Sequence, residues 1–278
     1  MAAITAAAVK ALREKTDLPM MECKKALTEA DGDEARAIEI LREQFKKVQL
    51  KRQDNATEEG RIFISISDDG SEAAMVEIQC ESAPVATGDV LKDFGDGLVE
   101  TLLNGSGASS PDELMSQAPI SGGDSFQSQF EEMVNKIREK IVVNRIARVK
   151  GPVGGYVHHD FKLGVLFQAS GEVKDPAILR DVAMHIAALR PTCTFANELD
   201  EAVVKTERDR LVAEAKASGK PDNIIEKMVD GRMKAFYVEQ GVLVFQPFAK
   251  DDSKSVEKAL SEAGVEAVGF HRWRVGGE

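Results

Sequence analysis

Histidine and carboxylate side chains are the groups in this chain that could bind a metal ion or carry out acid–base chemistry. Imidazole nitrogens and carboxylate oxygens suit several divalent ions, and the best candidates are His158, His159, Asp160 and His185. Neighbouring residues of a strand point to opposite faces of a sheet, so His158 and His159 cannot easily bind one ion together. We therefore expect no metal site and no cofactor.

The chain also lacks the motifs of other catalytic chemistry. It contains no phosphate-binding loop of the G-x-x-x-x-G-K-[ST] type, no nucleophile elbow and no dinucleotide-binding glycine fingerprint. The cysteines at 23, 80 and 193 have no CxxC spacing, which argues against a zinc cluster and a disulfide framework. What remains is a protein that acts through its surface and not as an enzyme.

Composition narrows the class further. The 278 residues suffice for two or three domains with cores of their own. The formal net charge of −11 argues against direct nucleic-acid binding, which needs a basic surface. We expect no signal peptide and no membrane contact, because no apolar run approaches the roughly 20 residues that cross a bilayer. The expected location is cytoplasmic.

Two methionines at a predicted helix start are the clearest sign of a binding surface. Pro19 fits the first helical position, where a missing N–H costs nothing. One face of the helix would carry Met20, Cys23, Leu27 and Ala30, with Met21 and Lys24 pointing elsewhere. Methionine fills irregular cores as readily as it lines adaptable interfaces, so both helix packing and docking are open interpretations.

Residues 1–52 carry the pattern of three short helices. The turn at 31–33 would end the second helix and cap the third. The expected inward residues are Ala8, Val9 and Leu12 on the first helix and Ile38, Leu41, Phe45 and Val48 on the third. Three helices in so few residues resemble a ubiquitin-associated (UBA) bundle. The polar stretch 53–60 is expected to be a linker.

Residues 61–145 are expected to form the first of two α+β units. Alternating apolar residues in 62–66 and 74–80, on either side of a turn at 68–71, predict a β-hairpin. Helices are expected after Val85 and over 126–143.

Residues 146–278 repeat the order of hairpin and helix. Strands are expected at 146–150, 155–159, 163–168, 242–245 and 268–275, with helices after Pro176 and at 253–263. The repeat is weak, because the residues barely correspond. The expected fold class is α+β, with two related subdomains and antiparallel sheets.

An insertion at about 198–238 indicates two charged helices joined at 218–221. Their narrow apolar seam would consist of Leu199, Val203, Leu211, Ile224, Ile225, Met228 and Phe236. Such a pair either folds back on the sheet or projects as an antiparallel coiled coil that meets another protein.

Two separate segments resemble the signature regions of one family. P-M-M-E-C-K-K-A-L-T-E-A-D-G-D at 19–33 and S-G-K-P-D-N-I-I-E-K-M-V-D-G-R-M-K at 218–234 are similar to those of bacterial elongation factor Ts, the nucleotide exchange factor for elongation factor Tu. The similarity continues at 181–188, 246–248 and 268–275. The resemblance implies a UBA-like module, two related core subdomains and a protruding coiled coil. It also implies elongation factor Tu as the partner, in its GDP-bound and nucleotide-free forms, with homodimers or a 2:2 complex possible.

The same resemblance implies which residues contact the partner. Matched position by position, they are Met20, Met21, Lys24, His158, Ala249 and Lys250. For His158, an ordinary surface histidine is the alternative interpretation.

One family motif is altered here. The family carries Thr-Asp-Phe-Val in a loop that is thought to displace the partner's magnesium ion, whereas this chain has Ser82, Ala83, Pro84 and Val85. The aspartate and the phenylalanine are both missing, although the preceding Glu81 could supply a carboxylate. The alternative function is therefore a scaffold or chaperone-like relative that binds without efficient exchange.

Overall fold

Three helices open the chain in the computed structural model, which describes residues 4–16, 18–217 and 221–277, apart from the side chains of 45–49. They are α1 (Ala6–Thr16), α2 (Met20–Glu29) and α3 (Glu34–Lys51). The Asp33 carboxylate accepts a hydrogen bond from the backbone N–H of Arg36 and so caps α3. Val9 and Leu12 are buried as predicted, whereas Ala8 is exposed. The predicted inward side chains of Phe45 and Val48 lie outside the described residues.

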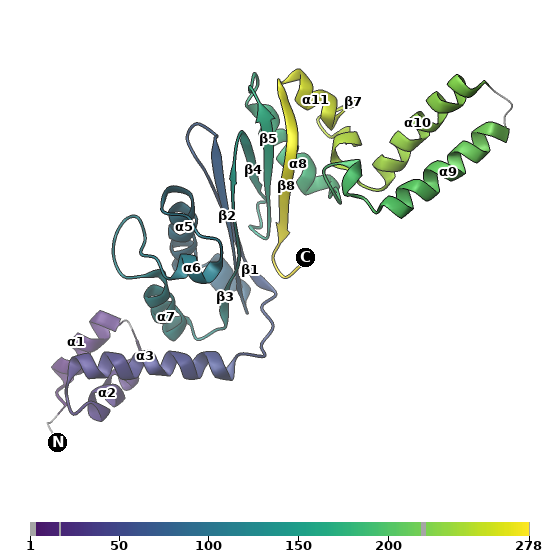
Figure 1. Cartoon of the computed structure of the whole chain (residues 1–278). Coiled ribbons are helices and arrows are strands. Elements are labelled where there is room, and N and C mark those ends of the chain that lie inside the picture. Colours follow the sequence, from purple (N-terminus) through teal and green to yellow (C-terminus); the bar gives the residue numbers. More distant parts are fainter. Residues whose placement is uncertain (1–3, 17, 218–220, 278) are drawn as a thin grey trace.

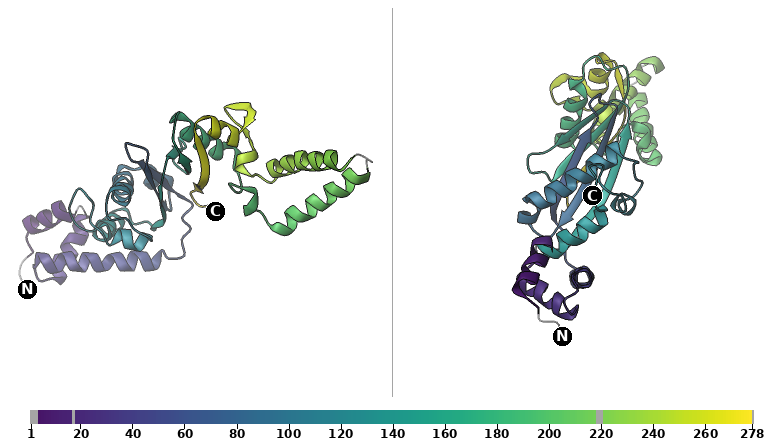
Figure 2. Two further views of the ribbon diagram at one scale, coloured as in Figure 1. Left: turned by 45° about the horizontal axis from the view of Figure 1, so that its top comes forward. Right: turned by 90° about the vertical axis from the view of Figure 1, so that its left-hand side faces the viewer.

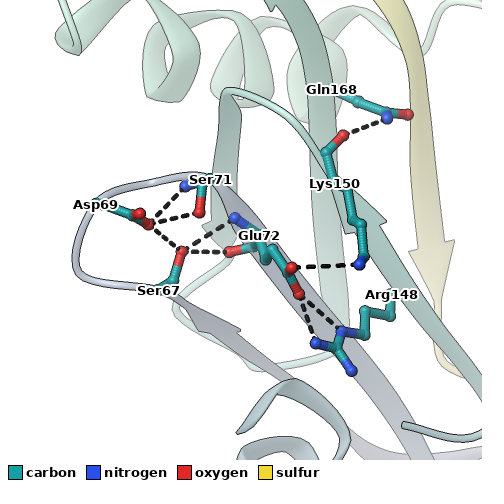
Figure 3. Close-up of polar contacts among 7 residues, drawn as sticks. All are labelled: Ser67, Asp69, Ser71, Glu72, Arg148, Lys150 and Gln168. Carbon is teal, nitrogen blue, oxygen red and sulfur yellow. Dashed lines mark hydrogen bonds and ion pairs between the residues drawn. The ribbon is translucent and has the colours of Figure 1, made fainter.

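The first sheet has the order β1-β2-β3 and is antiparallel throughout. Its strands are β1 (Glu59–Ile66), β2 (Glu72–Cys80) and β3 (Ile141–Lys150), which confirms the predicted hairpin. In the β1–β2 turn, hydrogen bonds from Ser71 and Ser67 lower the pKa of the Asp69 carboxyl to about 2 (Figure 3). One outer face is covered by α4 (Ala83–Thr87), α5 (Asp89–Asn104), α6 (Pro111–Met115) and α7 (Phe126–Ile137).

The second sheet has the order β4-β5-β8 and is also antiparallel. It consists of β4 (Val153–Val157), β5 (Leu163–Gly171) and β8 (Val265–Arg274). Two helices, α8 (Ala177–Leu189) and α11 (Val256–Glu262), share a hydrophobic core with it. Along the chain between α8 and α11 lie the 3-10 turns η1 (Ala196–Glu198) and η2 (Leu243–Phe245) and a small hairpin of β6 (Pro247–Phe248) and β7 (Asp251–Ser255).

The inner faces of the two sheets pack against each other. Ile62 and Met75 of the first sheet share an apolar cluster with Leu166 and Trp273 of the second. The sheets approach so closely at Gly164 that a Cβ there would lie 2.5 Å from the Ile62 side chain, so only glycine fits. The core is therefore a sandwich with α5 and α7 on one side and α8 and α11 on the other (Figure 1).

Four expected boundaries of helices and strands were wrong. The helix predicted over 126–143 stops at Ile137, because Arg138 takes a left-handed backbone conformation with φ of 64°. Residues 141–150 then form one strand that pairs with β2, so 146–150 belong to the first sheet. The strand predicted at 242–245 is not formed, because Val242 makes an isolated β-bridge to Cys193 and residues 243–245 then form the 3-10 turn η2. The helix predicted from 253 begins at Val256, after β7.

A pair of helices, α9 (Glu201–Ala217) and α10 (Asp222–Glu239), extends from the sandwich at the end opposite to α1–α3 (Figure 2). Its buried seam consists of Leu211, Ala215, Ile225, Val229 and Met233. The prediction was wrong for Val203 and Ile224, whose side chains are 47% and 42% exposed. Within the described residues, no helix is both long and apolar enough to cross a membrane.

Candidate functional site

Both methionines at the start of α2 lie on the surface. Met20 is 50% exposed and Met21 is 72% exposed, while Cys23 and Leu27 of the same helix are buried. Pro19 was predicted at the first helical position but lies one residue before the helix, which leaves Met20 in the open first turn. Lys24 is exposed one turn further along α2. Exposed apolar side chains beside a lysine suit a protein partner better than a helix core.

An ion pair connects α2 to the first core unit. The Arg138 guanidinium at the end of α7 donates to the Glu22 carboxylate, and the buried Asn135 amide donates to the carbonyl of Leu41 in α3. Met20, Met21 and Lys24, which we call the methionine surface, are thus attached to the sandwich by polar contacts as well as by the chain itself.

Residues 82–85 form the entry to a short helix and not an extended loop. Ser82 precedes α4, its hydroxyl donating to Glu139 Oε1 at 2.6 Å and its backbone N–H to Glu139 Oε2 at 3.1 Å. Val85 packs against the first core, whereas Ala83 and Pro84 are exposed. The segment therefore offers a small apolar tip on an anchored base.

The carboxylate of Glu81 is held on three sides. It accepts hydrogen bonds from Arg52 at 2.7 and 2.9 Å, from the Asn55 amide at 2.8 Å and from the backbone N–H of Lys140 at 2.5 Å. Burial raises the pKa of this carboxyl, but the hydrogen bonds from Lys140, Asn55 and Arg52 outweigh burial and lower it. Glu81 thus fastens the end of α3 to the first sheet, which leaves it poorly placed to reach an ion on a partner.

His158 lies just beyond β4, in the turn to β5. Its backbone N–H donates to the carbonyl of Leu163 at 2.9 Å, and its Nδ1 is 2.9 Å from the Tyr156 hydroxyl oxygen. The ring centroids of His158 and His159 are only 4.2 Å apart, so the expectation that they point to opposite faces was wrong. The physical reason is that β4 ends at Val157, which removes both histidines from the regular pleat.

The turn around His158 is stabilised by an arginine from the other sheet. Phe161 has a left-handed backbone with φ of 58°, and the Arg61 guanidinium of β1 lies 3.7 Å from its ring centroid. The carbonyl of Phe161 also accepts from the backbone N–H of Ile62 at 2.9 Å. The histidine turn is therefore fixed against the first sheet.

Ala249 and Lys250 form the exposed turn between β6 and β7. The Ala249 N–H donates to His185 Nδ1 at 3.1 Å, and Lys250 Nζ lies 2.6 Å from an Asp181 carboxylate oxygen on α8. Both interactions tie the turn to α8. The sequence analysis did not predict that His185 supports this turn. The available signal was that His185 and Gln246 both lie in segments that resemble the family, at 181–188 and 246–248.

His185 is a buried neutral histidine with both ring nitrogens occupied. Since Nδ1 accepts from Ala249, Nε2 carries the proton and donates to Gln246 Oε1 at 2.9 Å. Burial lowers its pKa, opposed in part by the Gln246 hydrogen bond. Its ring has no free nitrogen for a metal ion. Across residues 4–16, 18–217 and 221–277, no three histidine, cysteine, aspartate or glutamate side chains are arranged to bind one.

The chain is similar to one well-populated family. Residues 81–277 match the family model described as Elongation factor TS. The protein named Elongation factor Ts from Hydrogenovibrio crunogenus is 40% identical over 276 residues, covering 99% of this chain and 92% of the relative. Those from Methylococcus capsulatus and Thioalkalivibrio sulfidiphilus are 41% and 38% identical, each covering 98% of this chain and 92% of the relative.

Proposed function

The chain belongs to the elongation factor Ts family of nucleotide exchange factors, and from this premise we propose that it binds elongation factor Tu and promotes release of GDP. The observation that carries the proposal is the similarity over nearly the full length, which includes both the core and the methionine surface. The exposure of Met20 and Met21 supports it, because a docking role requires them at the surface.

Exchange by this route needs contacts but no catalytic group. Elongation factor Tu would hold GDP through donors around the phosphates and a bridging magnesium ion. A partner that binds the nucleotide-free form more tightly must weaken nucleotide binding by the same factor, since the two equilibria are linked. We therefore propose a factor that acts through protein contacts and is not an enzyme.

Three surfaces are proposed to make those contacts. Met20, Met21 and Lys24 present an apolar pair beside a positive charge at one end of the molecule. His158 lies in a turn that is fixed by hydrogen bonds to its neighbours. Ala249 and Lys250 lie in a second turn, which contacts α8. In such an interface a few apolar anchors should carry most of the binding energy.

The segment Ser82, Ala83, Pro84 and Val85 is proposed to press on the partner near its magnesium site. Its anchored base and exposed Pro84 support a steric role. Neither Ala83 nor Pro84 carries a charge, and Glu81 is engaged with Arg52 and Asn55. We propose that magnesium leaves because the apolar tip shifts the partner's backbone, with no carboxylate from this chain approaching the ion.

The altered segment also supports a second candidate. A scaffold with the same docking surfaces but a weaker wedge would bind elongation factor Tu without accelerating GDP release. The two candidates differ in a single measurable property, because binding is common to both and only the exchange factor changes the release rate.

We also propose a domain layout, a location and an assembly for the protein. The three N-terminal helices are proposed to be a UBA-like module over 1–52, followed by a linker that ends at 58 and not at 60, because β1 begins at Glu59. The expected boundary between the core subdomains at 145/146 falls inside β3, so we propose subdomains at 59–150 and 151–278 in place of 61–145 and 146–278. In the second, α9 and α10 are proposed to be a coiled coil inserted at about 198–238. We propose that the protein works in the cytoplasm without direct contact to nucleic acid or membrane, and that it can form a homodimer or a 2:2 complex with its partner.

The deciding experiment is release of a fluorescent GDP analogue from elongation factor Tu of the same source, at fixed magnesium, with and without this protein. Strong acceleration is the expected result, and it would make the missing aspartate and phenylalanine dispensable. Tight binding with unchanged release would support the scaffold. Absence of binding would overturn both candidates.

A further inference from the structure

Glu77 is a fully buried carboxylate between the two sheets. It lies on β2 and is 0% exposed. Its β2 neighbour Met75 belongs to the inter-sheet cluster, whereas Val76 and Ile78 belong to the core under α5 and α7, so Glu77 faces the second sheet. A charged group in that position must be compensated or it would be costly to fold.

The compensation comes from Arg145, directly opposite on β3. The Arg145 Nε donates to Glu77 Oε2, and Gln79 Nε2 donates to the other carboxylate oxygen at 2.8 Å. The same guanidinium lies over the ring of Trp273 on β8, with 4.8 Å from its central carbon to the ring centroid. Its Nη2 is 3.4 Å from the carbonyl oxygens of Arg274 and Gly277. One arginine therefore touches both sheets.

An ion pair in this position is a poor device for stability alone. Replacing a buried pair by apolar residues of similar volume is often neutral or stabilising, because desolvation offsets the Coulomb attraction. What the pair adds is direction, since the planar guanidinium has to meet the carboxylate, the indole face and the two carbonyls at once. A sliding movement of one sheet over the other would break the contacts of Arg145 to the indole and to the two carbonyls together, whereas Glu77, which lies on the same sheet as Arg145, would keep the guanidinium in its orientation.

We propose that Glu77 and Arg145 are a positioning pair that fixes the second sheet relative to the first, so that the contact surfaces on both engage one partner molecule simultaneously. This inference rests on the proposed function. β2 continues from Glu77 directly into the 81–85 segment, while the second sheet carries the turn at His158 between β4 and β5. The Lys250 turn is held by α8, which packs on the same sheet. Loss of the fixed arrangement would lower the effective concentration of one surface once the other has bound.

A matched control lies on the opposite face of the same two strands. Glu72 of β2 pairs with Arg148 of β3, with donor–acceptor distances of 2.9 and 2.6 Å (Figure 3). Arg148 approaches Gly107 on the helix side of the sheet and so points away from the second sheet. The two pairs thus share chemistry and strands but differ in whether they bridge the sheets.

The test compares the full-length double variants Glu77→Met with Arg145→Met and Glu72→Met with Arg148→Met. Trp273 is the single tryptophan of the chain, so acrylamide quenching of its fluorescence reports on the inter-sheet contact without a label. Thermal unfolding is measured on each variant, and GDP release from elongation factor Tu is measured across a range of exchange-factor concentrations.

For the Glu77/Arg145 variant we expect thermal unfolding close to that of the unmodified protein and at least twofold greater quenching of Trp273. We also expect the half-saturating concentration for GDP release to rise about tenfold or more, with the maximal rate changed less than twofold. The control variant should leave all three quantities nearly unchanged. A merely structural pair would instead lower the unfolding temperature and the fraction of active protein.

Unchanged Trp273 quenching, or an equal change in the control variant, would overturn the inference. Greater quenching with an unchanged half-saturating concentration would also overturn it, because the sheets would then be released without effect on partner binding. Failure of the unmodified protein to accelerate GDP release would contradict the proposed function. Even then, binding of elongation factor Tu measured on the same variants would still decide whether the pair positions the two surfaces.

Discussion

Met20 is the residue at which docking and helix packing make opposite predictions. Its side chain is half exposed, whereas Cys23 one turn along is fully buried. Met20→Asp should weaken binding of elongation factor Tu at least tenfold, because a charge would be desolvated in an apolar contact, while the unfolding temperature stays unchanged. Titration calorimetry and thermal unfolding measure the two effects. Ile120→Asp, at a site 49% exposed, is the matched control, and an equal loss in both variants would contradict a specific contact.

Glu81 invites a prediction about stability. Glu81→Ala removes a carboxylate that joins Arg52, Asn55 and Lys140, and should destabilise the fold by about 1–3 kcal/mol, since donors lose their acceptor. The rate of GDP release per folded molecule should be unchanged. Chemical denaturation gives the first quantity and stopped-flow fluorescence the second. Slower release with normal stability would mean that Glu81 replaces the missing aspartate after all.

His185 makes stability depend on pH in a defined direction. Burial depresses its folded-state pKa below the unfolded value of 6.5, so the unfolded chain takes up the proton first as pH falls. The neutral ring therefore contributes stability above about pH 6.5 that is lost as pH drops through the folded-state pKa. The loss of stability between pH 7.5 and pH 5.5, measured by denaturation, should be smaller for His185→Gln than for the unmodified chain. An equal loss would show that His185 does not titrate differently on folding.

At the scale of elements, the α9–α10 pair has a core of its own. Leu211 and Val229 belong to a small cluster whose described members all lie on α9 and α10. Leu211→Ala should cost the pair about 2–4 kcal/mol through the lost methyl groups and the cavity left behind. Amide exchange should then accelerate in residues 201–239 and stay slow in β2 and β5, because the opening is local. Uniform acceleration across the chain would mean that the pair and the sandwich unfold as one unit.

The elements that sequence patterns predicted well are those whose apolar period is regular. Alternation around a polar turn identified β1 and β2, and α8, whose Leu179, Val182 and Ile186 are buried as predicted, began after Pro176 as expected. The helix prediction was wrong for residues 138–143, because a left-handed Arg138 ends the helix with no glycine to mark it. Residues 242–245 failed because a short apolar run can fill a core as a turn as well as a strand.

The candidate site also has features that local sequence patterns predict and features that they do not. Exposure of Met21 and Lys24 follows from a helix face that can be read from spacing. The hydrogen bonds from Ala249 to His185 and from Ser82 to Glu139 join residues 64 and 57 positions apart. Contacts at such separations depend on how the sheets and helices assemble, so local patterns cannot reveal them.

The proposed contact surfaces lie at separate places along an elongated body, and this determines how their binding energies combine. Met20 lies on the N-terminal helices and Lys250 beside α8, with the sandwich between (Figure 1). Changes at separated sites on one rigid body add within about 0.5 kcal/mol when both sites contact the same partner molecule. Met20→Asp combined with Lys250→Ala should therefore multiply the two single-variant increases in the dissociation constant for elongation factor Tu, as measured by calorimetry. The double variant could instead have the same dissociation constant as the weaker-binding single variant. That result would mean that the surfaces at Met20 and Lys250 bind different molecules, as in an assembly of more than one copy of each chain.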